Sequence, residues 1–71
     1  MNFDFRMLRA KIIEKYGSQQ AFAKAYGISN NSFSRKMHNK TPFSSEDIIK
    51  MSEMLGIDKQ RIGEYFFTKS V

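Results

Sequence analysis

The sequence predicts a small all-helical protein, and two observations carry this prediction. Apolar residues recur every three or four positions in several segments, which is the spacing of one face of an α-helix. Serine or aspartate precedes these segments and glycine follows several of them, as is typical of helix starts and helix ends. No segment of useful length alternates apolar and polar residues as a half-buried strand would. We therefore expect five short helices.

The first helix is expected from about Asp4 to Tyr16. Asp4 can act as its cap, and Gly17 follows its last residue. The positions that make its apolar face are Phe5, Leu8, Ile12 and Tyr16. This stripe is wide enough to pack against neighbouring helices.

Residues 18–37 are expected to form two short helices joined by a tight turn. The first would span residues 19–26, with Ser18 as its cap. Gly27 can adopt the left-handed backbone that ends a helix. Ser29 would then cap a second helix over residues 30–37. Ala23 is small where two steeply crossing helices would touch, so these helices are expected to pack closely.

Two more helices are expected in the C-terminal half. Pro42 disfavours helical backbone at the residue before it, so a loop must come first. Ser44 with Asp47 three residues later resembles a capping box, which opens a fourth helix that ends at Gly56. A fifth helix is expected at about residues 59–65, with Asp58 as its cap. Gly63 should weaken this last helix.

Length and composition limit the functions that the chain can have. The 71 residues suffice for one domain, expected over residues 1–71, with one small core. The chain has no cysteine, so neither a disulfide framework nor a thiolate zinc site is expected. His38 is the only histidine, and no spacing of residues matches a catalytic, cofactor or metal site. We therefore expect no enzyme, no cofactor and no metal.

The chain is also not expected to enter or cross a membrane. No apolar run approaches the roughly 18 residues of a membrane span. The first residues lack the basic and apolar regions of a secretory signal. The expected location is therefore the cytoplasm.

The positive charge of the chain gathers in its first two thirds. The net charge is +5, and residues 18–43 contain four basic residues and no acidic one. The later residues carry most of the acidic side chains. An acid-free segment of this kind favours a polyanionic partner, because neutralising phosphates releases counterions.

The second helix of the pair carries side chains that suit the reading of DNA bases. Amides can bond adenine, and a guanidinium is the most common bidentate partner of guanine. The candidate base-reading residues are Asn30, Asn31, Ser34 and Arg35. Arg35 could equally bind a phosphate, and the asparagines could merely favour a helix start. Candidate phosphate contacts are Ser32, Lys36 and Lys40, since a lysine needs no fixed geometry.

These residues resemble the helix-turn-helix of the phage repressor and Cro family. The family pattern is Gln-x-x-x-Ala-x-x-x-Gly-Ile/Val-Ser-x-x-x-apolar-Ser-Arg. The residues that match it are Gln19, Ala23, Gly27, Ile28, Ser29, Phe33, Ser34 and Arg35. The chain is most similar to small Cro-like regulators of Gram-positive prophages, over about residues 5–65. It departs from them at Asn39, where glycine is usual, although asparagine tolerates the left-handed backbone.

The resemblance implies a five-helix, lambda-repressor-like fold and a transcriptional regulator that binds double-stranded DNA. Residues 30–37 would be the recognition helix in the major groove, and Gln19 would bind a phosphate at its start. The protein would act at the nucleoid of a bacterial host, at a palindromic operator. The alternative is a helix-turn-helix module that binds another regulator rather than DNA, because the fold alone does not decide function.

Three consecutive aromatic residues near the end of the chain predict a contact surface. Neighbouring residues of a helix point about 100° apart, so the rings cannot all be buried on one side. We therefore expect a weak homodimer on DNA, with a contact formed from Tyr65, Phe66 and Phe67. The alternative is that all three rings close the core of a monomer.

Overall fold

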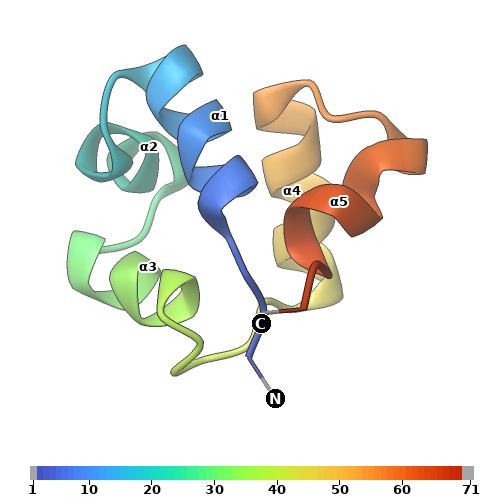
Figure 1. Ribbon diagram of the computed structural model, residues 1–71. Coiled ribbons are helices and arrows are strands. Elements are labelled where there is room, and N and C mark those ends of the chain that lie inside the picture. Colours follow the sequence, from blue (N-terminus) through green and yellow to red (C-terminus); the bar gives the residue numbers. More distant parts are fainter. Residues whose placement is uncertain (1, 70–71) are drawn as a thin grey trace.

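The computed structural model describes residues 2–69 and is built from helices (Figure 1). Their bounds are α1 (Arg6–Tyr16), α2 (Gln19–Tyr26), α3 (Asn30–Met37), α4 (Ser45–Leu55), the 3-10 helix η1 (Lys59–Arg61) and α5 (Ile62–Phe66). The extended pairing among residues 2–69 is an isolated antiparallel bridge between Phe3 and Lys69. The all-helical class expected from the sequence is confirmed. None of the helices in this part of the chain has the length and apolar character that crossing a membrane requires.

Helix α1 lies in the middle of the molecule and packs against α2, α4 and α5 (Figure 1). Helix α3 packs against α2 at one edge. All five α-helices contribute to the core, whose largest fully buried side chains are Phe22, Phe33, Phe66, Leu8, Ile12, Met51 and Leu55. Because each helix is short, its stability depends on this shared core more than on its own hydrogen bonds.

The helix-turn-helix has the bounds that the sequence predicts. The Ser18 hydroxyl accepts the Ala21 N–H at the start of α2, and Ser29 does the same for Ser32 at the start of α3. Gly27 has a φ of 103°, so the left-handed turn between the helices depends on glycine. Ala23 is 1% exposed on α2, and α2 packs against α3. A larger side chain at this buried position would be expected to overpack the core.

Helix α1 begins at Arg6, with Phe5 and not Asp4 in the cap position, which is one residue later than expected. The carboxylate of Asp4 accepts the backbone N–H of Arg6 at 2.9 Å and pairs with its guanidinium at 2.7 Å. The Asp4 backbone N–H donates to the Thr68 carbonyl at 2.7 Å, which holds this segment extended beside the C-terminal residues. Asp4 is therefore part of the bridge between the chain ends and lies before the helix.

Asn39 adopts the left-handed turn for which the resemblance to Cro-like regulators implies a glycine. Its φ is 62°, in the left-handed region. Its side-chain oxygen accepts the Phe3 N–H at 2.9 Å, and its side-chain nitrogen donates to the Phe3 carbonyl at 2.9 Å. A glycine would allow the same turn but could not hold the N-terminal segment.

One carboxylate connects three helices. Asp47, in the first turn of α4, accepts hydrogen bonds from the Tyr26 hydroxyl on α2 and, at 2.7 Å, from the Lys36 ammonium on α3. It also accepts the Ser44 N–H at 2.9 Å and completes the expected capping box. Burial raises the pKa of Asp47, but the hydrogen bonds from Lys36, Tyr26 and Ser44 outweigh burial and hold it well below its usual range.

The fifth helical segment differs from the prediction. A turn of 3-10 helix over Lys59–Arg61 precedes α5, and Asp58 makes no side-chain capping bond. Tyr65 and Phe66 are 6% and 2% exposed, because α1 and α4 flank α5 on two sides. Phe67 lies beyond the helix and is 52% exposed. At least one exposed ring is thus confirmed, but Tyr65 and Phe66 are core residues and unavailable for the expected dimer contact.

The substitution Ala23→Leu should destabilise the fold by about 1–3 kcal/mol, because it overpacks the crossing of α2 and α3. Urea unfolding followed by circular dichroism measures this loss. Ala25→Leu is the matched control, since Ala25 is exposed on the same helix. Equal unfolding midpoints for the two variants would contradict the packing described here.

Acid should weaken the fold through Asp47. The pKa of Asp47 is lower in the folded chain than in the unfolded one. The contribution of Asp47 to the free energy of unfolding is therefore complete above the ordinary carboxylate pKa, and it is lost as the pH falls toward the lower pKa of the folded chain. At pH 7, the substitution Asp47→Asn should lower the free energy of unfolding by about 1.5–3 kcal/mol, which is typical of hydrogen bonds to charged groups. Urea unfolding from pH 7 to pH 2 should show a smaller pH dependence in this variant than in Glu46→Gln, its exposed neighbour on α4.

Candidate functional site

The exposed face of α3 presents a row of polar side chains. Asn31, Arg35 and His38 are exposed and follow one another at intervals of four and three residues, so they share one face of the helix. Phe33 on the opposite face is 1% exposed and anchors α3 to the core. The outer face of α3 is therefore available to a partner along its whole length.

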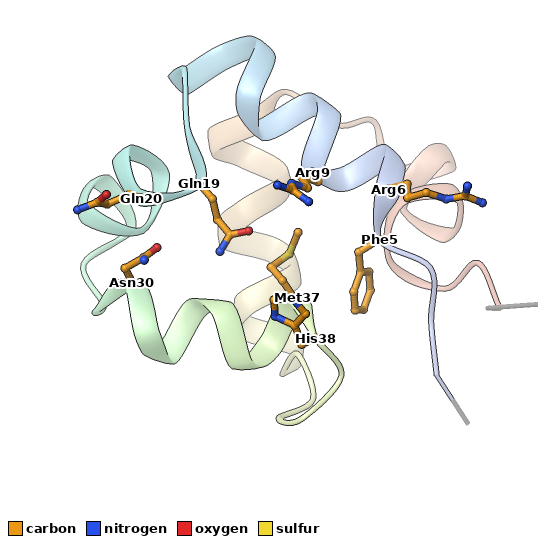
Figure 2. Close-up of a pocket in the computed structure, with 8 residues that line it drawn as sticks. All are labelled: Phe5, Arg6, Arg9, Gln19, Gln20, Asn30, Met37 and His38. Atoms are coloured by element: carbon orange, nitrogen blue, oxygen red, sulfur yellow. The ribbon is translucent and has the colours of Figure 1, made fainter.

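A recess of about 420 Å³ lies between α3, α2 and the start of α1. Figure 2 shows Arg9 and Gln19 directed into the space above Met37, whereas Arg6 and Gln20 point away from it. Arg6 is held by Asp4, and no ion pair of Arg9 occurs among residues 2–69. The recess combines one free guanidinium with the amides of Gln19 and Asn30, which suits an anionic or polar group.

A second hollow of about 300 Å³ lies on the outer side of α3. The residues that line it are Asn31, Ser34, Arg35, His38 and Lys40. Three of the four predicted base-reading residues and one predicted phosphate contact therefore gather here. Asn30, the fourth, lies in the first recess with Gln19. Their roles toward DNA stay predictions.

His38 lines both hollows, although it is not among the binding residues predicted from the sequence. Its Nδ1 atom lies 2.8 Å from the Ser34 carbonyl, which can only accept, so Nδ1 carries the proton in the neutral ring. The Nε2 atom is then left to accept a hydrogen bond from a partner. The spacing of four residues from Ser34 is the signal in the sequence that could have indicated this arrangement. Arg9 is the other site residue that the sequence analysis missed.

Lys36 is separated from the other candidate phosphate contacts. Its side chain is 19% exposed and its ammonium lies 2.7 Å from the Asp47 carboxylate. Lys36 is separated from the others because its position on α3 faces α4 and not the outer surface. The Ser32 hydroxyl bonds the Ser29 hydroxyl at 3.0 Å at the helix start. Lys40 is exposed and makes no ion pair within the described residues.

No group of three or more acidic, histidine or cysteine side chains that could hold a metal ion occurs within residues 2–69. The polar groups that line the hollows beside α3 are amides, a hydroxyl, one imidazole and basic side chains, and Phe5 and Met37 add apolar walls to the first recess. Such polar groups donate hydrogen bonds to polar or anionic partners and can bind either a nucleic acid or a protein.

The chain is similar to one solved regulator of a phage. This is the modulator of repression (MOR) of the temperate bacteriophage TP901-1 from Lactococcus lactis, whose solution structure is 37% identical in sequence. The match has a TM-score of 0.84 and covers 94% of this chain and 90% of that one. Comparison with the curated proteins found no match. The phage-regulator context expected from the helix-turn-helix fits this similarity.

The comparison with protein families does not single out the phage repressor and Cro family. The model that matches is described as "Protein of unknown function (DUF739)", and the match spans residues 1–69. Because it spans nearly the whole sequence, the chain belongs to the DUF739 family.

Proposed function

We propose that this chain is a regulatory protein of a phage-type genetic switch that acts inside a bacterial cell by binding another regulator. The observation that carries the proposal is the similarity to the modulator of repression at 37% identity over 94% of this chain. A protein that modulates repression has a repressor as its natural partner. The proposal is the protein-interaction alternative that the helix-turn-helix left open.

The charge of α3 supports this choice. Asp47 neutralises Lys36, so one of the three basic side chains at residues 35–40 is engaged within the protein. Affinity for DNA rises with the number of phosphates that lysine and arginine neutralise. Because Lys36 is paired within the protein, α3 offers fewer basic side chains to phosphates than its sequence indicates.

Mixing the chain with a phage-type repressor already bound to its operator should change the amount of bound operator. Repressors from the genome that encodes the chain would be tested one at a time in a mobility-shift assay, with isothermal titration calorimetry of chain and repressor without DNA. Direct binding in calorimetry together with a changed shift is expected. If no repressor binds the chain in calorimetry, the proposed function is wrong.

Sequence-specific binding of double-stranded DNA is the second candidate function. The observation that favours it is the hollow on the outer side of α3, where Asn31, Arg35 and Lys40 lie together in an acid-free segment. Helix α3 would enter the major groove, and the recess with Arg9 and Gln19 would face the phosphates beside it. A palindromic operator would then require two protomers.

The second candidate function predicts different roles for Arg35 and Lys40. On the best site selected from random duplexes, Arg35→Ala should weaken the binding free energy by about 1–3 kcal/mol and relax the preference for one base. Lys40→Ala should weaken binding to all sequences alike and lower the salt slope by about 1. Lys59→Ala, an exposed change far from α3 in sequence, is the control. Equal weakening of specific and random DNA by Arg35→Ala would rule out its base-reading role.

Of the three aromatic residues expected in a dimer contact, Phe67 is the one that a second protomer could reach. It is 52% exposed, whereas Tyr65 and Phe66 lie in the core. A weak homodimer on DNA would therefore have to use Phe67, and it belongs to the second candidate function.

A further inference from the structure

Five phenylalanine rings meet where the N-terminal residues, the loop between α3 and α4, and the end of α5 come together. Phe5 and Phe43 have ring centroids 5.1 Å apart, Phe43 and Phe66 5.5 Å, and Phe3 and Phe67 5.8 Å, all close to edge-to-face. These five residues and Lys36 line a cavity of about 170 Å³, called the aromatic pocket below. It adjoins the first recess beside α3 through Phe5, which lines both, and shares no lining residue with the outer hollow.

The aromatic pocket is formed before any partner arrives. Asn39 holds the backbone of Phe3 through two hydrogen bonds of 2.9 Å. The Asp4 N–H donates to the Thr68 carbonyl, and Phe3 pairs with Lys69 as an isolated bridge. The walls contributed by both chain ends are therefore fixed. Binding to a preorganised pocket avoids the entropy cost of ordering it.

The size and the walls of the aromatic pocket suit one apolar side chain. Its volume is below the range of cofactor and drug-sized ligand sites, which begin at about 300 Å³. Phe67 at its edge is 52% exposed and would gain by burial against a partner. A large apolar side chain inserted in a desolvated pocket is the usual anchor of a protein interface.

The charges around the aromatic pocket select the chemistry of the partner. None of its lining residues is acidic, and Lys36, its one charged residue, already pairs with Asp47. The loop on one side belongs to the acid-free segment 18–43 and carries the exposed Lys40. The backbone N–H groups of Lys40 and Thr41 both donate to the Arg35 carbonyl, which keeps the loop against the end of α3. The surface that complements this edge is acidic.

We propose that the aromatic pocket receives one large apolar side chain from an acidic segment of a partner protein. The inference rests on the proposed function, because it names the surface that holds the regulator. The apolar side chain supplies the anchor, and the carboxylates beside it meet Lys40 and Arg35. The contact therefore extends from the aromatic pocket onto the outer hollow of α3, which Lys40 and Arg35 line.

Two other occupants fit the aromatic pocket less well. A second copy of the chain would bring two molecules of net charge +5 together at edges that both carry Lys40, and like charges oppose such a contact. A nucleic acid matches the positive charge but offers no flexible apolar side chain. An acidic protein segment supplies both the charge and the anchor.

Three synthetic peptides of equal length test the proposal. The first is an acidic helical peptide with one central leucine, the second replaces this leucine by alanine, and the third reverses the charges around the leucine. NMR titration should show that the first peptide shifts the signals of Phe3, Phe43 and Phe67. The other two should bind at least about tenfold more weakly, the usual loss when an anchor is truncated. Equal binding of the alanine peptide or of the basic peptide would overturn the proposal, as would no binding of the first.

Variants of the chain locate the contact. Phe67→Ala should weaken the acidic leucine peptide about tenfold, and Lys40→Glu should weaken it as well. Ile49→Ala is the matched control, since Ile49 is 58% exposed and does not line the aromatic pocket. Equal affinities for Phe67→Ala and Ile49→Ala would place the contact elsewhere. A dimer in sedimentation that Phe67→Ala dissociates would mean that a second copy occupies the pocket, which also overturns the proposal.

The experiments distinguish a failure of the aromatic-pocket inference from a failure of the proposed function. If Phe67→Ala acts on a repressor and its operator as the unchanged protein does, the inference fails and the proposed function stands. If the unchanged protein binds no repressor but binds the acidic leucine peptide through Phe67, the proposed function fails and the pocket stands.

Discussion

The position of α3 depends on the carboxylate of Asp47. This side chain receives hydrogen bonds from Tyr26 on α2 and Lys36 on α3 while it caps its own helix with Ser44. Burial and the bond to Asp47 raise the pKa of Tyr26 to about 12, so the tyrosine stays a neutral donor at physiological pH. The ammonium of Lys50 bonds the Tyr26 carbonyl at 2.9 Å and lies over its ring, which extends the contact between α2 and α4. A partly buried carboxylate with this many donors fixes the angle between three helices more tightly than apolar contacts alone, since hydrogen bonds are directional.

The ion pair between Lys36 and Asp47 reduces the positive charge that the helix-turn-helix presents to a partner. Lys36 supports the fold, and the free positive charge beside α3 comes from Arg9, Arg35 and Lys40. His38 is held through Nδ1 by Ser34 and lines both hollows. The outer face of α3 is therefore moderately basic and rich in hydrogen-bonding groups, a character compatible with protein or nucleic acid. The similarity to a modulator of repression favours the protein partner.

An apolar surface, the aromatic pocket, lies where the two ends of the chain meet. Asn39 has a left-handed backbone and also bonds Phe3, so one residue ends the turn after α3 and secures the N-terminal segment. The aromatic rings beside it form both a core wall and a cavity open to a partner. Polar groups beside α3 and aromatic rings at the chain ends thus form adjoining surfaces, and Phe5 lines both the first recess and the aromatic pocket.

By itself, the sequence determined the fold class, the bounds of α2 and α3, the capping box of α4 and the left-handed Asn39, because these features depend on residues a few positions apart. Helical spacing also identified the buried Ala23 and the exposed position of one aromatic ring near the chain end. Only the tertiary structure decided that Lys36 meets Asp47, that Arg9 joins the recess beside α3, and that Tyr65 and Phe66 are buried while Phe67 is not. Each of these depends on which helix face meets another helix, and such contacts between residues distant in sequence leave no local pattern. The start of α1 shifted for the same reason, since Asp4 is held by Thr68, at the other end of the chain.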